Sequence, residues 1–314
     1  MTSHLTPVLM HVPAVGSLVS DGLPGSLAPW KAVVLGGLQV GSYLGFVLLV
    51  GTSIFLTWLW PEGRVVQVFG ALLGLGAVLT VLTAVVAVPV SVEQVGLGAF
   101  GGRLGALALA RAALVFVGVA FLQDVLASSR SHRGAISLWQ LGMITTYVLS
   151  SDAWGGSWVA VKVIATSLHL LATAAWLGGL LSLASVLVPR QNLDALHTVL
   201  PRFSQVAIAS VITLVVSGIL HALAIAGSLH ALATTAYGQA LLVKVAVFGA
   251  MLLLGNVGRR YASRLGHRPV SSLDASAPEA SITAFAVAVG AEFALALGVL
   301  VATASLVHFA PGAG

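Results

Sequence analysis

Cysteine is absent from the 314-residue chain, and charged residues are scarce. Without cysteine there is no disulfide, no thiolate metal site and no cysteine motif of the kind that metal-pumping ATPases carry. Charged residues make up 7% of the sequence, whereas soluble domains average about 25%. Because 58% of the residues are hydrophobic, most of the surface cannot face water, and the composition excludes a soluble enzyme.

Motifs for nucleotide binding are also missing in a usable form. The run 96–101 matches G-x-G-x-x-G, but no strand is predicted before it and no βαβ unit around it, as dinucleotide binding requires. The net charge of +5 reflects a few basic loop residues, which are typical of membrane proteins. We therefore expect no nucleotide, no nucleic acid and no catalytic residue.

Long hydrophobic runs dominate the remaining sequence. A bilayer core of about 30 Å requires roughly 20 apolar residues per helix. The sequence predicts an all-α, polytopic membrane helix bundle of about eight transmembrane helices in the lipid bilayer. Their predicted ranges are 32–60, 65–90, 103–126, 134–150, 158–188, 203–228, 238–258 and 281–309. We divide the chain into a tail (1–31), four helices (32–150) and a second unit (151–314).

The basic residues predict the orientation of these helices. Nine lie in the loops after predicted helices 1, 3, 5 and 7, namely Arg64, Arg130, Arg133, Arg190, Arg202, Arg259, Arg260, Arg264 and Arg268. Only Lys31, Arg103 and Lys162 lie on the other side. Since basic loops stay in the cytoplasm, we expect both termini outside (N-out, C-out) and the 1–31 tail to be extracytoplasmic.

Small residues predict close helix packing in the first half of the chain. Gly37, Gly41 and Gly45 form a stripe in the first predicted helix, and Gly70 and Gly74 form one in the second. Such stripes let helix backbones approach closely where lipid provides no hydrophobic driving force.

Two of the nine histidines lie inside predicted helices. Counted from the outer helix ends at 1.5 Å per residue, His169 lies about 15 Å deep and His221 about 10 Å deep. His230 and His308 are predicted near the same outer face. An ionisable side chain inside a membrane is costly and usually faces the bundle interior or a water-filled cavity.

Both intramembrane histidines lie on polar helix faces. The spacing of three and four residues groups Thr166, His169, Thr173 and Trp176 on one helix, and Ser210, Thr213, Ser217 and His221 on the next. Neutral imidazole binds copper, zinc, iron and nickel. The pattern favours a metal or cofactor site, and the alternative is that each histidine only forms hydrogen bonds between helices.

Glu292 is the only acidic residue well inside a predicted helix. Lys244, in predicted helix 7, and Arg111, in predicted helix 3, lie within reach of it. Two interpretations remain open. Glu292 forms a structural ion pair that fixes helix register, or it is a relay point for a proton or cation below the histidines.

The second half of the sequence resembles the CopD copper-resistance family. Residues 167–180 resemble that family's H-L-L-A-x-x-x-W-x-G-G-L helix, and residues 237–244 resemble its Y-G-x-x-L-L-x-K entry to helix 7. Arg202-Phe203-Ser204, Ser217-Gly218, the run 256–260 and Glu292 resemble other family positions in matching order. One departure is that many members have Gly-His-Ala before helix 5. This chain has Asp152 in that segment instead.

The resemblance implies copper handling at the bacterial plasma (inner) membrane, commonly uptake from the periplasm, in copper homeostasis and resistance. We expect copper ion as the bound metal, His169 and His221 as central ligands, and His308 and His230 as an outer approach. A periplasmic CopC-type copper-binding protein is the implied partner. The main alternative is a b-type cytochrome whose paired histidines ligate haem. A third is a structural partner of an oxidase assembly factor.

The orientation is testable because the chain has no native cysteine. We predict that single-cysteine variants R130C, R190C and R264C react with a membrane-impermeant maleimide only after the cells are permeabilised. A control cysteine at Ser17, in the tail, should react in intact cells. Labelling of position 264 in intact cells would reverse the predicted orientation.

Overall fold

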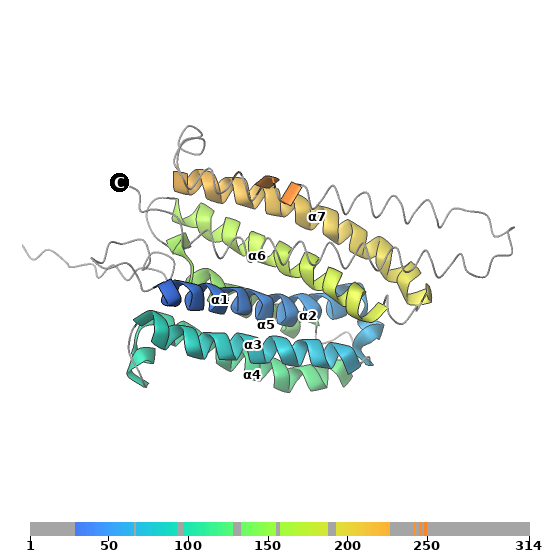
Figure 1. The fold of residues 1–314 in the computed structure, drawn as a ribbon. Coiled ribbons are helices and arrows are strands. Elements are labelled where there is room, and N and C mark those ends of the chain that lie inside the picture. The colour runs from blue at the N-terminus through green and yellow to red at the C-terminus, as the bar shows by residue number, and fades with distance from the viewer. Residues whose placement is uncertain are drawn as a thin grey trace, which may run out of the picture.

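The computed structural model describes residues 29–65, 67–92, 97–127, 133–154, 158–187 and 193–226, together with positions 242, 245, 246, 248 and 249. Within these residues the regular structure is helical throughout, and the long helices run alongside one another (Figure 1). This agrees with the predicted all-α bundle.

The first predicted span is one continuous helix built from four pieces. These are α1 (Pro29–Phe46), the π-helix η1 (Val47–Gly51), the short α2 (Thr52–Ile54) and a second π-helix, η2 (Phe55–Leu59). A 3₁₀ turn, η3 (Pro61–Val65), follows. π-Helical turns are rare and widen the helix locally, and here all of their residues except Trp58 are buried.

The other described elements follow the prediction closely. They are α3 (Gln67–Val92), η4 (Leu97–Gly101), α4 (Arg103–Ala127), α5 (Arg133–Leu149), η6 (Asp152–Trp154), α6 (Val159–Ser182), the π-helix η7 (Leu183–Leu187) and α7 (Leu193–Ala226). The G-x-G-x-x-G run ends in the 3₁₀ turn η4, with no strand among the described residues. α7 begins ten residues before the predicted start at 203 and continues through Pro201. The predicted spans 238–258 and 281–309 lie essentially outside the described residues.

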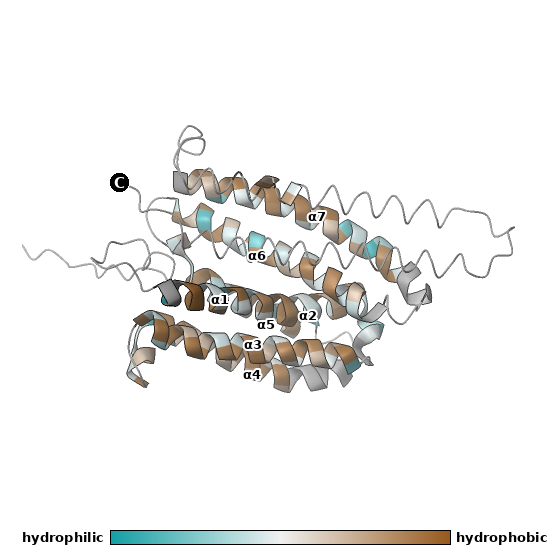
Figure 2. Ribbon diagram, in the orientation of Figure 1, coloured by the Kyte–Doolittle hydropathy of each residue, from teal (hydrophilic) through white to brown (hydrophobic). Residues whose placement is uncertain are grey.

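Five described helices are long and apolar enough to cross a membrane. They are Val33–Leu59, Gln67–Val92, Arg103–Ala120, Val159–Ser185 and Thr198–Ala224. Figure 2 shows hydrophobic residues along most of their length. Large apolar side chains such as Phe116, Val78 and Ile212 are exposed on their outer faces, as expected for surfaces that contact lipid rather than water. The chain is therefore a multi-pass membrane protein.

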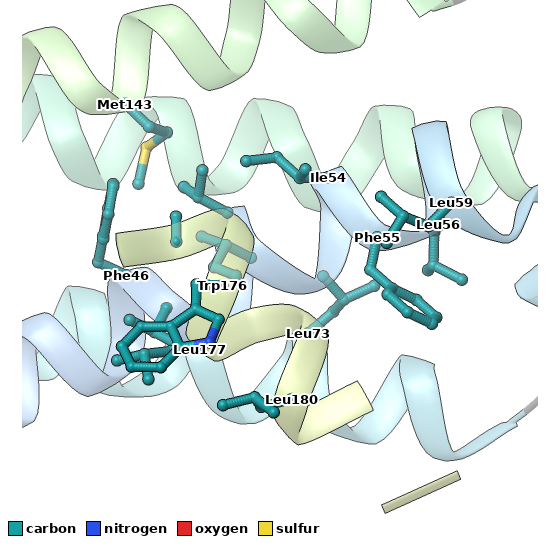
Figure 3. Close-up of a cluster of buried hydrophobic side chains, with 14 of the residues drawn as sticks. Phe46, Ile54, Phe55, Leu56, Leu59, Leu73, Met143, Trp176, Leu177 and Leu180 are labelled. Atoms are coloured by element: carbon teal, nitrogen blue, oxygen red, sulfur yellow. The ribbon is translucent and has the colours of Figure 1, made fainter. Parts of the chain in front are cut away.

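The first span and α6 form the centre of the described bundle. α6 packs between α7 on one side and the first span on the other, α3 packs on α1 and on α4, and α5 contacts α4 and α6. The largest core cluster gathers where these helices meet, with Phe46, Leu73, Met143 and Trp176 among its members (Figure 3). This packing holds α6, which carries His169, in a fixed position.

Two glycine contacts set the distance between these central helices. A Cβ added to Gly51 would contact the carbonyl oxygen of Ala174 and would lie 2.8 Å from the Cα of Gly178. A Cβ added to Gly45 would lie 2.8 Å from the backbone nitrogen of Thr80. The first span therefore touches α6 and α3 backbone to backbone, which larger residues would prevent.

The predicted glycine stripes are only partly correct. Gly45 and Gly41 contact α3, at Thr80 and Thr83 respectively. The α3 glycine at this interface is Gly76, whereas Gly70 and Gly74 have open space at the Cβ position, as does Gly37 on α1. The four-residue spacing indicated a close contact correctly, but it did not show which side of α3 faces α1.

We predict that Gly51→Ala destabilises the bundle, because its methyl group must displace the α6 backbone. Overpacking of this kind typically costs about 1–3 kcal/mol. Gly74→Ala is the matched control and should be neutral. The measurement is the Tm of the purified protein in detergent, and equal Tm values for both variants would contradict the packing described here.

Candidate metal site

His169 and His221 meet across the interface of α6 and α7. The two helices are antiparallel there, and each histidine bonds to a hydroxyl group on the opposite helix. His169 Nδ1 lies 3.0 Å from Ser217 Oγ, and His221 Nδ1 lies 3.3 Å from Thr166 Oγ1. The imidazoles are also close enough to interact electrostatically. We call these four residues the α6–α7 quartet.

The sequence spacing explains the crossed arrangement of the quartet. Thr166 and His169 are three residues apart on α6, and Ser217 and His221 are four apart on α7, so each pair shares one helix face. The polar faces predicted from the sequence therefore do face each other. Two further hydroxyls of these faces, Thr173 and Thr213, bond to carbonyl groups of their own helices.

The quartet is buried on the side of Ser217 and exposed on the side of His169. Ser217 is 2% exposed, His221 is half-buried and His169 is exposed. Among the described residues, no cluster of three or more His, Cys, Asp or Glu side chains occurs. The described helices thus contribute two imidazoles on a face that an ion and further ligands can reach.

The remaining predicted site residues are not brought to the quartet by the described helices. His230, His308, Glu292 and Lys244 lie outside the described residues, so their predicted roles stay predictions. Phe248, in the predicted span 238–258, packs edge to face on Trp176 at 5.6 Å between ring centroids. That contact places part of this span against α6.

Arg111 forms a separate buried network between α4 and α5. Its guanidinium donates to the hydroxyl and carbonyl oxygens of Thr146 and to the hydroxyl of Ser150, at 3.0–3.2 Å. It also lies 3.8 Å from the ring centroid of Tyr147. The hydroxyl of Tyr147 donates in turn to the carbonyl of Ser42 on α1. Arg111 therefore links three helices of the first half, using neutral acceptors and an aromatic face.

A second polar contact joins α5 to the first span. Gln140 Nε2 donates to Ser53 Oγ at 3.0 Å, and both side chains are buried. Neither Gln140 nor Thr146 was identified from the sequence as a contact between helices. The two residues are six positions apart, about 120° around α5, so they contact different neighbours.

The C-terminal part of the chain matches a known protein family. Residues 197–306 match the CopD family, described as copper resistance protein D, and this match covers about a third of the chain. It includes most of α7, with Ser217 and His221, and the positions of Lys244 and Glu292. It does not include α6, so the resemblance noted at residues 167–180 lies outside the matched residues.

A curated relative agrees with the family match. The chain is 36% identical over 102 residues to the copper transport protein CutJ of Bacillus subtilis (strain 168). The aligned part covers 31% of this chain and 18% of that protein, so the chain spans less than a fifth of this relative's length. No solved structure matches the chain. Residues 197–306 of this multi-pass membrane protein are thus similar to the copper resistance protein D (CopD) family.

Proposed function

We propose that the protein binds copper between α6 and α7 and passes it across the bacterial plasma membrane. The observation that carries this proposal is the α6–α7 quartet, which holds two imidazoles on one helix interface in a chain whose residues 197–306 match the copper resistance protein D family. Imidazole nitrogen is a good copper ligand. Ionisable side chains inside a membrane usually mark the path of an ion or proton.

His169 and His221 act as the central ligands in this proposal. Since no group of three or more His, Cys, Asp or Glu side chains occurs among the described residues, further coordination comes from other parts of the chain. His230 and His308 are the predicted outer approach. His169 is exposed, which leaves room for such a ligand to reach a metal bound at its ring.

The contact between the helices favours a metal ion over haem at this position. In bis-histidine haem the two ligands lie on opposite sides of the porphyrin ring. Here α6 and α7 are joined directly by hydrogen bonds at both histidines. They also meet at Gly179, where an added Cβ would clash with the Phe203 ring. A porphyrin placed between these two helices would break the hydrogen bonds at both histidines and the contact at Gly179.

Uptake is the direction that the predicted orientation supports. If the start of α6 and the end of α7 face outward, both histidines lie in the outer half of the membrane, where copper arriving from the periplasm would meet them first. A periplasmic CopC-type protein is then the proposed copper donor, and the role is copper homeostasis and resistance.

We predict that His169→Ala and His221→Ala each weaken copper binding by more than the roughly 10–100-fold that is typical of changes in outer-shell partners. His197→Ala is the matched control, because His197 lies on α7 about 36 Å from His221 at 1.5 Å per residue. The measurement is copper titration and metal analysis of the purified protein. If the three variants bind copper equally, the site assignment is wrong.

Variants of Glu292 test whether the proposed copper path continues deeper into the membrane than the histidines. We propose that Glu292 pairs with Lys244 rather than with Arg111, because the guanidinium of Arg111 already donates three hydrogen bonds to α5. An unpaired charge at mid-membrane costs about 2.5–3.5 kcal/mol. Glu292→Gln should therefore lower the Tm, Lys244→Met in the same molecule should restore it, and Arg111→Met should not. A stable Glu292→Gln protein that binds copper without transporting it would instead indicate a relay.

A further inference from the structure

The hydroxyl of Ser217 lies between a ring nitrogen of His169 and a carbonyl oxygen of its own helix. A serine hydroxyl has one proton to donate. Ser217 Oγ lies 3.3 Å from the carbonyl oxygen of Leu214, which can only accept, and 3.0 Å from His169 Nδ1. When the hydroxyl donates to the carbonyl, its oxygen can only accept from the imidazole. This arrangement favours the N–H of His169 at Nδ1.

A neutral imidazole has one N–H and one lone pair. With the proton at Nδ1, the lone pair of His169 is at Nε2, on the opposite side of the ring from Ser217. A metal binds the unprotonated nitrogen, and the partner of the other nitrogen sets which one that is. The buried hydroxyl of Ser217 on α7 therefore influences which ring nitrogen of His169, on α6, has the lone pair that binds a metal.

We propose that Ser217 is a positioning residue, which holds His169 as the Nδ1–H tautomer and presents Nε2 to copper. This proposal rests on the proposed copper site. Because each hydroxyl belongs to the helix opposite its histidine, the packing of α6 on α7 orients both rings at once. A metal bound at Nε2 of His169 would then meet a ring that is already oriented.

A hydroxyl that only joined the two helices would affect stability but not the tautomer. The test therefore measures the tautomer in the metal-free protein, using ¹⁵N NMR of histidine-labelled full-length chain in detergent. A copper titration of the same samples follows. The variants are Ser217→Ala, which removes the hydroxyl, and Ser217→Thr, which retains it. The control is Ser210→Ala, at a buried serine two turns away on α7.

We expect wild-type His169 to be the Nδ1–H tautomer. Ser217→Ala should shift it toward Nε2–H and weaken copper binding about 10–100-fold, as is typical for loss of an outer-shell partner. Ser217→Thr should retain the wild-type tautomer and affinity, and Ser210→Ala should change neither.

An Nε2–H tautomer in the wild-type protein would overturn the proposal without any variant, even if Ser217→Ala fails to fold. So would a Ser217→Ala protein with unchanged tautomer or unchanged copper affinity, while His169→Ala abolishes binding. In that case the copper site stands and only the role of Ser217 is wrong. If His169→Ala binds copper as the wild type does, the proposed site itself fails, and the NMR spectrum still reports on the tautomer separately.

Discussion

The need to satisfy every polar group inside the bilayer determines most of this structure. Lipid offers no hydrogen bonds, so the backbone is helical throughout the described spans. Hydroxyl groups such as those of Thr83 and Thr145 bond to carbonyls one turn earlier on their own helix. The same constraint puts the guanidinium of Arg111 among oxygen acceptors and an aromatic ring, and it directs each imidazole of the α6–α7 quartet to a hydroxyl across the interface.

The backbone contact between Gly51 and α6 positions the quartet relative to the core of the bundle. It fixes α6 against the first span about one and a half to two and a half turns from His169, at the level of Ala174 and Gly178. α7 then packs on the opposite side of α6, where Gly179 accommodates the Phe203 ring. Small residues thus allow three helices to approach closely, and the alignment of the two histidines follows from that approach rather than from either helix alone.

Much of this was predictable because membrane spans carry a strong sequence signal. The five membrane-spanning helices that the structure describes were predicted by apolar length, and the polar faces of α6 and α7 by residue spacing. The π-helices η1, η2 and η7 were not predictable, since a local change in helical pitch depends on packing rather than on composition. That Gly76, rather than Gly70 or Gly74, lies at the interface with the first span likewise depends on how α3 is rotated about its axis. The sequence also does not show that Thr166 and Ser217 each bond to the histidine of the opposite helix, because these contacts depend on the axial register of α6 against α7.

The quartet also crosses the boundary of the family match. Ser217 and His221 lie within residues 197–306, whereas Thr166 and His169 lie before them. Each histidine bonds to a hydroxyl from the other part of the chain, so neither part holds an oriented imidazole pair by itself. A metal site at this interface therefore requires α6 to be docked on α7, and the glycine contacts that position α6 contribute to it without touching the metal. Residues that lie far from a ligand in the sequence, such as Gly51, thereby help to determine its geometry.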